Sequence, residues 1–435
     1  MINRREVLVA GLAAPILWPG TACAAAARFI EPETYGARGD GKTDDTKALQ
    51  ICLDIAPPGT AVRLRTGAVY RIDTNVRPTW GEFGGLRLKS GQILELNGGE
   101  LRALPSSGKF GSVVQGYQTS GWKIVGPGRI VGDRSIHLGT AGEWGMGISA
   151  WTCSNFQIVG GVEISECWGD GICVVGHGAY CDTFLIEDVK VRKCRRNGIT
   201  IASGRNGEIR NFDIEHVVDI APAGGIDLEP DEPKLPNRNI KISNGRIRTV
   251  SVGIYVSVGN EDVLITGVDI EARNSGVIVS DNSVNVRIQN NPSIKALTGY
   301  QEGGAIRTVV ARPETIRGLL IRDNQLFGGG GFVIDIFGSG FQDVVITGNR
   351  ISAIFAGTQG IARVGAGVFT DNICTIGPLG GVKSEYFIHL QSVTYGRNVY
   401  RNQSPHPMYS ALRGGRDIGG DRFESKTLVH HWEPL

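Results

Sequence analysis

The sequence predicts an all-β chain wound into a right-handed parallel β-helix, and three observations support this. Glycine contributes 63 of the 435 residues, roughly double its ~7% average usage, which indicates many tight corners. Short runs of Ile and Val with alternating polarity recur along the chain and indicate many strands. Several runs begin with a glycine, and these glycines are spaced 23–28 residues apart, a period typical of stacked repeats.

The repeated strand has one register along the chain. A repeat of this length cannot bury its apolar face alone, whereas stacked coils bury one continuous core. We expect roughly nine to eleven coils, because the leucine spacing of a leucine-rich repeat and the four strands of a propeller blade are both missing. Alternation along the strand separates an inward from an outward ladder. The inward ladder is expected at Ile172, Ile199, Ile226 and Ile254, and the outward ladder at Cys173, Thr200, Asp227 and Tyr255.

The first residues predict a targeting signal rather than part of the fold. Arg4 and Arg5 precede an apolar stretch that is too short to span a bilayer comfortably. Ala22-Cys23-Ala24 fits a signal-peptidase cleavage pattern. Residues 1–24 therefore predict a bacterial twin-arginine export signal, and a periplasmic or secreted protein.

The β-helix itself is expected over residues 29–400. A short helix over Thr46 to Ile55, begun by Asp44 or Asp45, is expected to cap the open end of the first coil. Residues 401–435 have no clear repeat and are expected to form an irregular C-terminal tail.

Two motifs resemble known proteins. Residues 34–50, TYGARGDGKTDDTKALQ, resemble the N-terminal signature of the pectate-lyase-like β-helix superfamily, which includes polygalacturonases, polysaccharide lyases, epimerase-like proteins and phage tailspikes. The resemblance covers about residues 29–400 and implies the fold rather than one reaction. Gly176-His177-Gly178 resembles a polygalacturonase motif, although the other motifs of those enzymes are not found at matching positions.

One coil concentrates acidic residues on the outward face. Asp227, Glu229 and Asp231 occupy alternate positions, so neighbours lie ~6.5–7 Å apart along the strand. Carboxylates this close disfavour joint ionisation, which suits one general acid and one base or nucleophile. Asp170 and Asn197 precede the repeat glycines of earlier coils and are expected on the same face. We predict Asp227 and Glu229 as the catalytic pair, with Asp170 sharing the role and Asp231 tuning it. A solvated acidic edge is the alternative.

Other residues are candidates for substrate binding around this coil. Aromatic rings provide platforms for the apolar faces of sugars, and cations suit anionic sugars. A plain surface or packing role is the alternative for each. The candidates are Glu143 and Trp144, supported by Trp151 and Trp168; His177 and Asn197; and Arg205, Lys234, Tyr255 and Arg307.

Composition narrows the functional class. Lys and Arg number 45 against 43 Asp and Glu, a net charge of +2, which excludes a whole-chain basic field for nucleic acid. We expect a polysaccharide or oligosaccharide substrate, no membrane span in the mature chain, no metal or other cofactor, and a monomer or trimer. The leading prediction is a glycoside hydrolase. A lyase or epimerase acting on uronic-acid sugars, which would hold calcium through the acids, and a non-catalytic polysaccharide-binding β-helix remain alternatives.

The cysteines predict no zinc site, because paired Cys-x-x-Cys motifs are missing. Cys167 and Cys194 each stand four residues before a repeat glycine. We expect them to stack on adjacent coils ~4.8 Å apart, as a disulfide or as two thiols.

Overall fold

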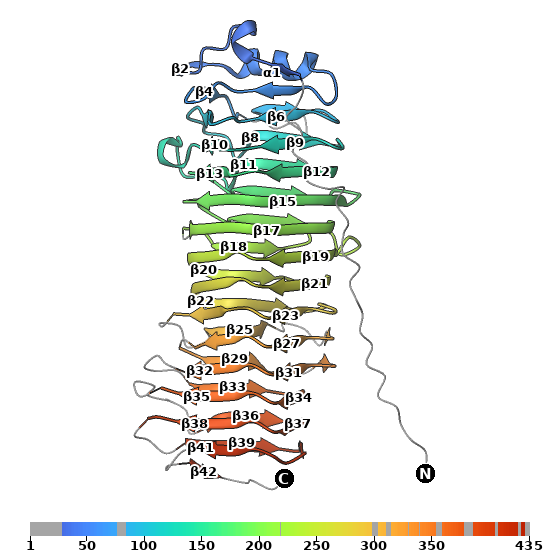
Figure 1. Cartoon of the computed structure of the whole chain (residues 1–435), viewed down its shortest axis with the longest axis vertical. Helices are drawn as coiled ribbons and strands as arrows, with labels where there is room; N and C mark the ends of the chain where they lie inside the picture. Colours follow the sequence, from blue (N-terminus) through green and yellow to red (C-terminus); the bar gives the residue numbers. More distant parts are fainter. Residues whose placement is uncertain are drawn as a thin grey trace.

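The computed structural model describes residues 28–75, 84–217, 219–297, 303–309, 315–328, 330–338, 340–353, 359–377, 386–404, 408–424 and 428–430. Within these residues the chain winds into an elongated column of parallel strands (Figure 1). The structure confirms the predicted all-β right-handed parallel solenoid. It has about 13 turns, more than the nine to eleven expected, because several coils lack the Gly-Ile signature on which that number rested.

Three faces run along the column, and each strand pairs in parallel with its equivalents in the neighbouring coils. Face 1 consists of β5 (Leu86–Leu88), β8 (Phe110–Tyr117), β11 (Trp144–Trp151), β14 (Ile172–Val175), β16 (Ile199–Ala202), β18 (Gly224–Leu228), the second halves of β20 (Arg246–Val256) and β22 (Asp269–Ser280), β25 (Gly304–Val309), β29 (Phe332–Ile336), β33 (Gly360–Val364), β36 (Tyr386–Gln391), β39 (Met408–Arg413) and β42 (Leu428–His430).

Face 2 begins with β2 (Asp40–Asp44), β4 (Val69–Ile72), β7 (Glu100–Ala103), β10 (Gly128–Val131) and β13 (Val162–Ser165), and continues through the second halves of β15 (Cys181–Arg192) and β17 (Gly204–Val217), the first halves of β20 and β22, β24 (Ser293–Ala296), β28 (Gln325–Phe327), β32 (Arg350–Ala353), β35 (Ile373–Ile376), β38 (Val399–Asn402) and β41 (Arg422–Glu424).

Face 3 consists of β1 (Phe29–Ile30), β3 (Ala61–Arg63), β6 (Ile93–Glu95), β9 (Lys123–Val125), β12 (Ser154–Val159), the first halves of β15 and β17, β19 (Asn237–Ser243), β21 (Asn260–Thr266), β23 (Arg287–Gln289), β27 (Leu320–Arg322), β31 (Val345–Thr347), β34 (Gly367–Thr370), β37 (Val393–Gly396) and β40 (Arg416–Asp417). The remaining elements are β26 (Ile316–Arg317), β30 (Phe341–Gln342), the 3-10 turns η1 (Pro32–Tyr35) and η2 (Arg134–Ile136), and one α-helix, α1 (Thr46–Ile55).

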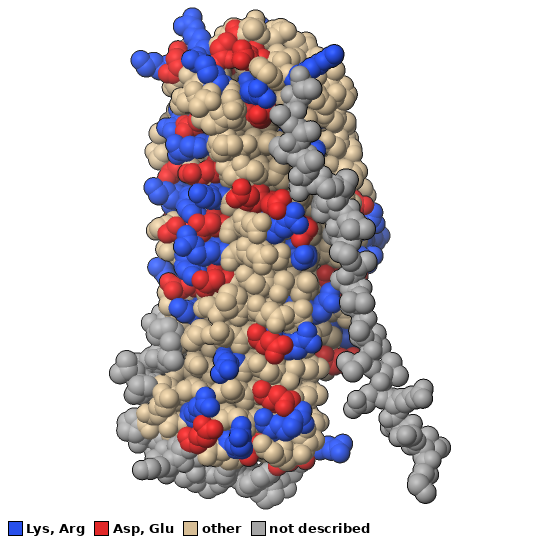
Figure 2. All heavy atoms as spheres, viewed as in Figure 1, with Lys and Arg blue, Asp and Glu red and all other residues tan. Residues whose placement is uncertain are grey.

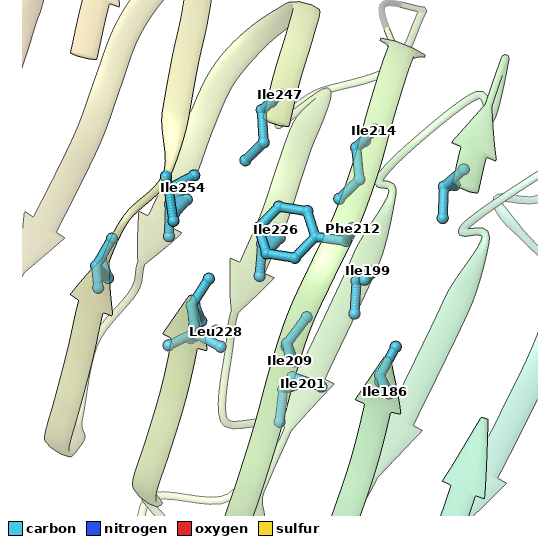
Figure 3. Packing of buried hydrophobic residues seen from close by; sticks show 14 of the residues in the cluster. Ile186, Ile199, Ile201, Ile209, Phe212, Ile214, Ile226, Leu228, Ile247 and Ile254 are labelled. Carbon is cyan, nitrogen blue, oxygen red and sulfur yellow. The ribbon is translucent and has the colours of Figure 1, made fainter. Parts of the chain in front are cut away.

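The core is the continuous apolar interior of the coils. The predicted inward ladder is confirmed, because Ile172, Ile199, Ile226 and Ile254 pair in register and are fully buried. Figure 3 shows three of them across neighbouring strands. Burying one such side chain stabilises the fold by about 1.5–3 kcal/mol, so the ladder fixes which side chains of the same strands face outward.

Helix α1 occupies the predicted residues and lies at the N-terminal end of the column (Figure 1). Leu49, Cys52 and Leu53 are buried and belong to the main core. At the start of the helix, the Thr46 backbone N–H donates to Asp44 at 3.0 Å. The Asp45 carboxylate instead accepts from backbone N–H groups of the preceding turn. That the helix serves as a cap stays a prediction.

The predicted irregular tail after residue 400 is wrong for the described residues. Strands β38 to β42 continue the stack, and β40, β41 and β42 pair with β37, β38 and β39. Pairing satisfies the backbone groups of these strands, although their sequence carries no recognisable repeat. The predicted export signal, residues 1–24, lies outside the described residues. No described helix has the length and apolar character needed to cross a membrane.

Candidate active site

The predicted outward ladder is confirmed in register. Cys173, Thr200, Asp227 and Tyr255 stand side by side on face 1. Their exposure differs from expectation, because Asp227 is 0% exposed and Asp170, at the corner before β14, is 1% exposed. The two acids expected on an open surface are therefore covered by neighbouring side chains and loops.

Asn197 joins the acids of successive coils. Its side-chain Nδ2 donates to Asp227 Oδ2 at 3.2 Å and to Thr200 Oγ1 at 3.0 Å. Its backbone N–H donates to Asp170 Oδ1 at 3.0 Å, and its Oδ1 accepts from the Gly224 N–H at 3.0 Å. The predicted convergence of Asp170, Asn197 and Asp227 is thus present in the structure.

Arg196 is a central residue that the sequence reasoning missed. Its Nη1 donates to Asp170 Oδ2 at 3.2 Å and its Nη2 donates to Glu229 Oε2 at 2.8 Å. The arginine side chain is only 14% exposed. A buried carboxylate requires a cation or a hydrogen-bond donor as its partner. Arg196 directly precedes Asn197 in the sequence, and this position was the signal that could have identified it as the partner of Asp170.

Burial shifts the pKa values of the two covered acids, Asp227 and Asp170. It raises the pKa of Asp227 well above its usual value, and the nearby Glu229 charge adds to that effect. Burial also raises the pKa of Asp170, although the Arg196 charge opposes the shift. Burial lowers the pKa of Arg196, but the charges of Asp170 and Glu229 outweigh it and raise that pKa overall.

Two acids of the coil remain within reach of solvent. Strand β18 ends at Leu228, just before them. The Glu229 side chain is 41% exposed, and Asp231 is exposed. Partial burial and the Glu229 charge raise the pKa of Asp231. Glu229 and Asp231 are therefore the members of the cluster that a dissolved molecule can contact.

The predicted His177 lies beside this accessible pair. Its Nδ1 is 3.4 Å from Glu232 Oε1, and the Gly178 N–H donates to the same oxygen at 2.8 Å. The loop after β14 is thus held against the loop that contains Asp231.

The predicted aromatic platform is largely occupied by packing within the protein. Trp144, beside the half-buried Glu143, stacks on Phe110 at 4.4 Å. Trp168 is enclosed between His137 at 3.9 Å and the Arg195 guanidinium at 3.8 Å. Trp151 packs against a small apolar cluster on the outside of face 1, which consists of Met146, Cys173, Val175 and Ala202.

The predicted basic residues are dispersed. Arg205 was expected near the acidic coil, but it belongs to the face-3 half of β17 and pairs with Asp182. The corner at Ser203, between the end of β16 and the start of β17, places Arg205 on face 3 rather than face 1. Lys234 is exposed in the turn after Asp231. Tyr255 stands next to Asp227, and Arg307 lies two strands beyond Tyr255.

Two expectations from the sequence concern metal ligands and the thiols near this site. Among the described residues, no group of three or more His, Cys, Asp or Glu could hold a metal ion. Cys167 and Cys194 are buried free thiols. The Cys194 thiol raises the pKa of Cys167 well above its usual value, and burial adds to this effect, as expected for stacked thiols on adjacent coils.

Comparison with known proteins defines the class. A family model described as "Right handed beta helix region" matches residues 170–382. The uncharacterized protein YclG of Bacillus subtilis is 28% identical over 227 residues, which cover 46% of this chain and only 38% of that protein. The family-model match agrees with the right-handed parallel β-helix fold of the structure and assigns no more specific family.

Solved structures agree on the fold. The N-terminal fragment of bacteriophage phi29 gene product 12 is similar with a TM-score of 0.56 and 14% identity, over 90% of this chain and 71% of that chain. PfbA, a surface adhesin of Streptococcus pneumoniae, has a TM-score of 0.50 and 12% identity, over 93% of both chains. Structures with lower TM-scores include polygalacturonases, mannuronan C-5 epimerases and a phage tailspike. At these identities the similarity concerns the fold alone.

Proposed function

We propose that the protein is an exported carbohydrate-active enzyme that cleaves glycosidic bonds at the acidic coil of face 1. The observation that carries this proposal is the accessible pair Glu229 and Asp231, of which Glu229 is linked to the buried Asp170 through Arg196. Arg196 bonds Glu229 at 2.8 Å, and the pKa of Asp231 is raised by partial burial and by Glu229. Carboxyl groups whose environments differ in this way suit acid–base division of labour.

The pair performs the two halves of glycoside hydrolysis. Asp231 donates a proton to the glycosidic oxygen as the bond to the anomeric carbon breaks. Glu229, held by Arg196, acts on the opposite side as the base that activates water or as the nucleophile. The proposal differs from the pair expected from sequence, because Asp227 is fully buried and a general acid must reach its proton acceptor.

Asp227 and Asp170 are positioning residues in this proposal. Asp170 orients the guanidinium of Arg196 from below, at 3.2 Å, and Arg196 in turn orients Glu229. Asp227 holds the side chain of Asn197 at 3.2 Å, and Asn197 fixes the corner that precedes β18 through Gly224.

A polysaccharide screen tests the proposal. The protein is incubated with bacterial and plant polysaccharides, and both reducing ends and ultraviolet absorbance are recorded. On a substrate that gives reducing ends, Glu229→Gln and Asp231→Asn should each lower the rate at least about 100-fold, the range for loss of an acid–base catalyst. Glu424→Gln, which alters an exposed ion pair on β41, is the matched control and should retain the rate.

Other outcomes would assign a different reaction. An unsaturated product that absorbs in the ultraviolet would favour a lyase, and a change of sugar stereochemistry without cleavage would favour an epimerase. Full activity in both variants would exclude this pair and move the reaction elsewhere.

A non-catalytic polysaccharide-binding role is the second candidate. The observation that favours it is the burial of Asp170 and Asp227, whose hydrogen bonds join successive coils as purely structural groups do. PfbA, an adhesin, shares the fold. Binding of a polysaccharide without any product would select this role.

A further inference from the structure

A hollow lies on face 2, away from the acidic coil. It has a volume of about 440 Å³ and is lined by strands β4, β7, β10, β13 and β15 and by η2. Figure 2 shows charged side chains gathered in a dense column along the left edge of the molecule, over strands that Figure 1 labels β10 and β13. Within this charged face, the hollow is an interruption that lies over the uncharged residues Val131 and Ser165.

The interruption arises from one outward column of side chains. Arg71, Arg102, Val131, Ser165 and Arg192 follow one another in register across five coils. Val131 and Ser165 are short and nearly covered, at 6% and 5% exposed, and form the floor. The long cations before and after them form the walls, ~14 Å apart over three strand spacings.

Arg71 differs in its contacts from the other arginine of this wall, Arg102, which pairs with Glu100. Among the residues that the structure describes, the Arg71 side chain makes no ion pair and no hydrogen bond. Burial lowers the pKa of Arg71, and the neighbouring Arg102 charge adds to this shift. Arg196, which is more deeply enclosed, has the opposite shift because two carboxylates contact it. The nearby Glu100 charge opposes the lowering of the Arg71 pKa, but Glu100 forms its ion pairs with Arg102 and Arg129. A bound anion would therefore compensate the charge of the half-buried Arg71 guanidinium.

Arg192 is held by Asp213 and Glu215, and Glu163 and Glu166 also line the hollow, whereas other cations there share an acid or hold one weakly. Glu100 serves both Arg102 and Arg129. Lys193 is 3.6 Å from Glu166 and its side chain is 62% exposed. An exposed ion pair such as that of Lys193 contributes little to stability, so this side chain can turn toward a bound anion at small cost.

We propose that this hollow binds the oxyanion of a phosphate or sulfate ester, with Arg71 and Arg102 on one wall and Arg192 and Lys193 on the other. Guanidinium groups match the geometry of such oxyanions with paired hydrogen bonds. The hollow is far larger than a bare ion and falls within the ~300–1,000 Å³ typical of small-molecule sites. An ester on a sugar should therefore bind more tightly than inorganic phosphate or sulfate.

Isothermal titration at low ionic strength, where charges are less screened, tests the site. The probes are glucose 6-phosphate, inorganic phosphate and inorganic sulfate, with glucose as the neutral comparison. We expect glucose 6-phosphate to bind and glucose to give no heat. Arg71→Gln should weaken binding about tenfold or more, a loss of ~1.4 kcal/mol.

Two further variants keep the test decisive. Arg397→Gln removes the same charge from an exposed pair with Asp371 on another part of the chain and should change the affinity less than about twofold. Ser165→Asp puts a carboxylate on the floor and should abolish binding, even if Arg71→Gln fails to fold. No binding of any probe to the unmodified protein would overturn the proposal, and so would equal affinity in Ser165→Asp. The experiment measures binding on face 2, so its result does not depend on whether the acidic coil of face 1 is catalytic.

Discussion

Asp227 belongs both to the repeated register of the coils and to the candidate site. It belongs to a strand whose register is fixed by Ile226 in the core, so its side chain must face outward. Neighbouring residues nevertheless cover it completely. Within the described part of the chain, its Oδ1 is a buried atom with no hydrogen-bond partner, which is costly when the group is charged.

Asp227→Asn is expected to stabilise the protein at neutral pH. Burial raises the pKa of Asp227 in the folded state, so the folded protein retains a proton that the unfolded chain has lost. The contribution of this carboxyl to the free energy of unfolding is fully present below its unfolded pKa, about 4, and declines as the pH rises. The variant should therefore exceed the wild type at pH 7, and the difference should shrink toward pH 4. Urea unfolding followed by circular dichroism measures both.

Asp213→Asn is the matched control, because its expected effect on the free energy of unfolding at pH 7 is opposite to that of Asp227→Asn. Burial opposes the shift, but hydrogen bonds from Arg246 and Arg192 lower the pKa of Asp213. Its stabilising contribution is present above the unfolded pKa and is lost in acid, so this variant should be less stable than the wild type at pH 7. Destabilisation of Asp227→Asn at pH 7 by the ~1 kcal/mol of an average substitution would contradict the buried, protonated state.

Arg196→Gln is expected to destabilise the protein by about 3 kcal/mol at pH 7, the range for breaking a buried ion pair. The partner that matters is Asp170, because its side chain is 1% exposed while that of Glu229 is 41% exposed. The loss should become smaller in acid, where Asp170 takes up a proton. Thermal unfolding at two pH values, with Arg397→Gln as the exposed-pair control, measures it. A loss that is independent of pH would indicate a packing effect instead.

The sequence could predict which residues share a column but not which of them are covered. Alternation and the glycine period placed Asp227 between Thr200 and Tyr255, and the register of the strands confirms it. Exposure depends on side chains from other coils, such as Arg196, and on loop paths that follow no period. Arg205 shows the same limit, since the corner at Ser203, between β16 and β17, places it on face 3 rather than face 1.

At the scale of elements, one corner of the stack is held by asparagines. Each backbone N–H along this ladder donates to the side-chain oxygen of the next coil at about 3 Å, and the last step ends on a carboxylate. The amide groups also donate to backbone carbonyls, so the polar groups of the corner are satisfied without water. The members are Asn291, Asn324, Asn349, Asn372, Asn398 and Asp421.

Asn349→Leu is expected to destabilise the protein by about 3 kcal/mol. The substitution leaves the Asn324 N–H and the Ile321 carbonyl without their partners, and each buried unsatisfied group costs about 1–3 kcal/mol. Gln325→Ala alters a neighbouring exposed side chain and should change the free energy of unfolding by less than about 0.5 kcal/mol. Chemical denaturation of both variants measures the difference. Equal stability would show that the ladder contributes nothing net.

At the scale of the whole molecule, each coil contacts mainly the coils before and after it. Stability in such a solenoid is a sum of coil terms and interfaces between neighbours. The sequence predicted this architecture because the central coils repeat clearly. It underestimated the number of coils because pairing of backbone groups, which carries no side-chain signature, extends the stack through β39 to β42.

Removal of residues 403–435 separates the two descriptions of the C-terminal segment. An irregular tail could be deleted with little effect, whereas paired strands could not. The deletion would remove Asp421, which accepts the Asn398 N–H at 2.7 Å, and would leave β36, β37 and β38 with an open edge. Open strand edges promote association between chains. We therefore expect the truncated protein to have a lower midpoint of thermal unfolding than the full chain and to form larger species in size-exclusion chromatography. Asp421→Asn is the control for the truncation, because it keeps the oxygen that accepts the Asn398 N–H, and it should remain close to the wild type in stability and size. A truncated protein that stays as stable and as uniform in size as the full chain would show that the last coils are dispensable.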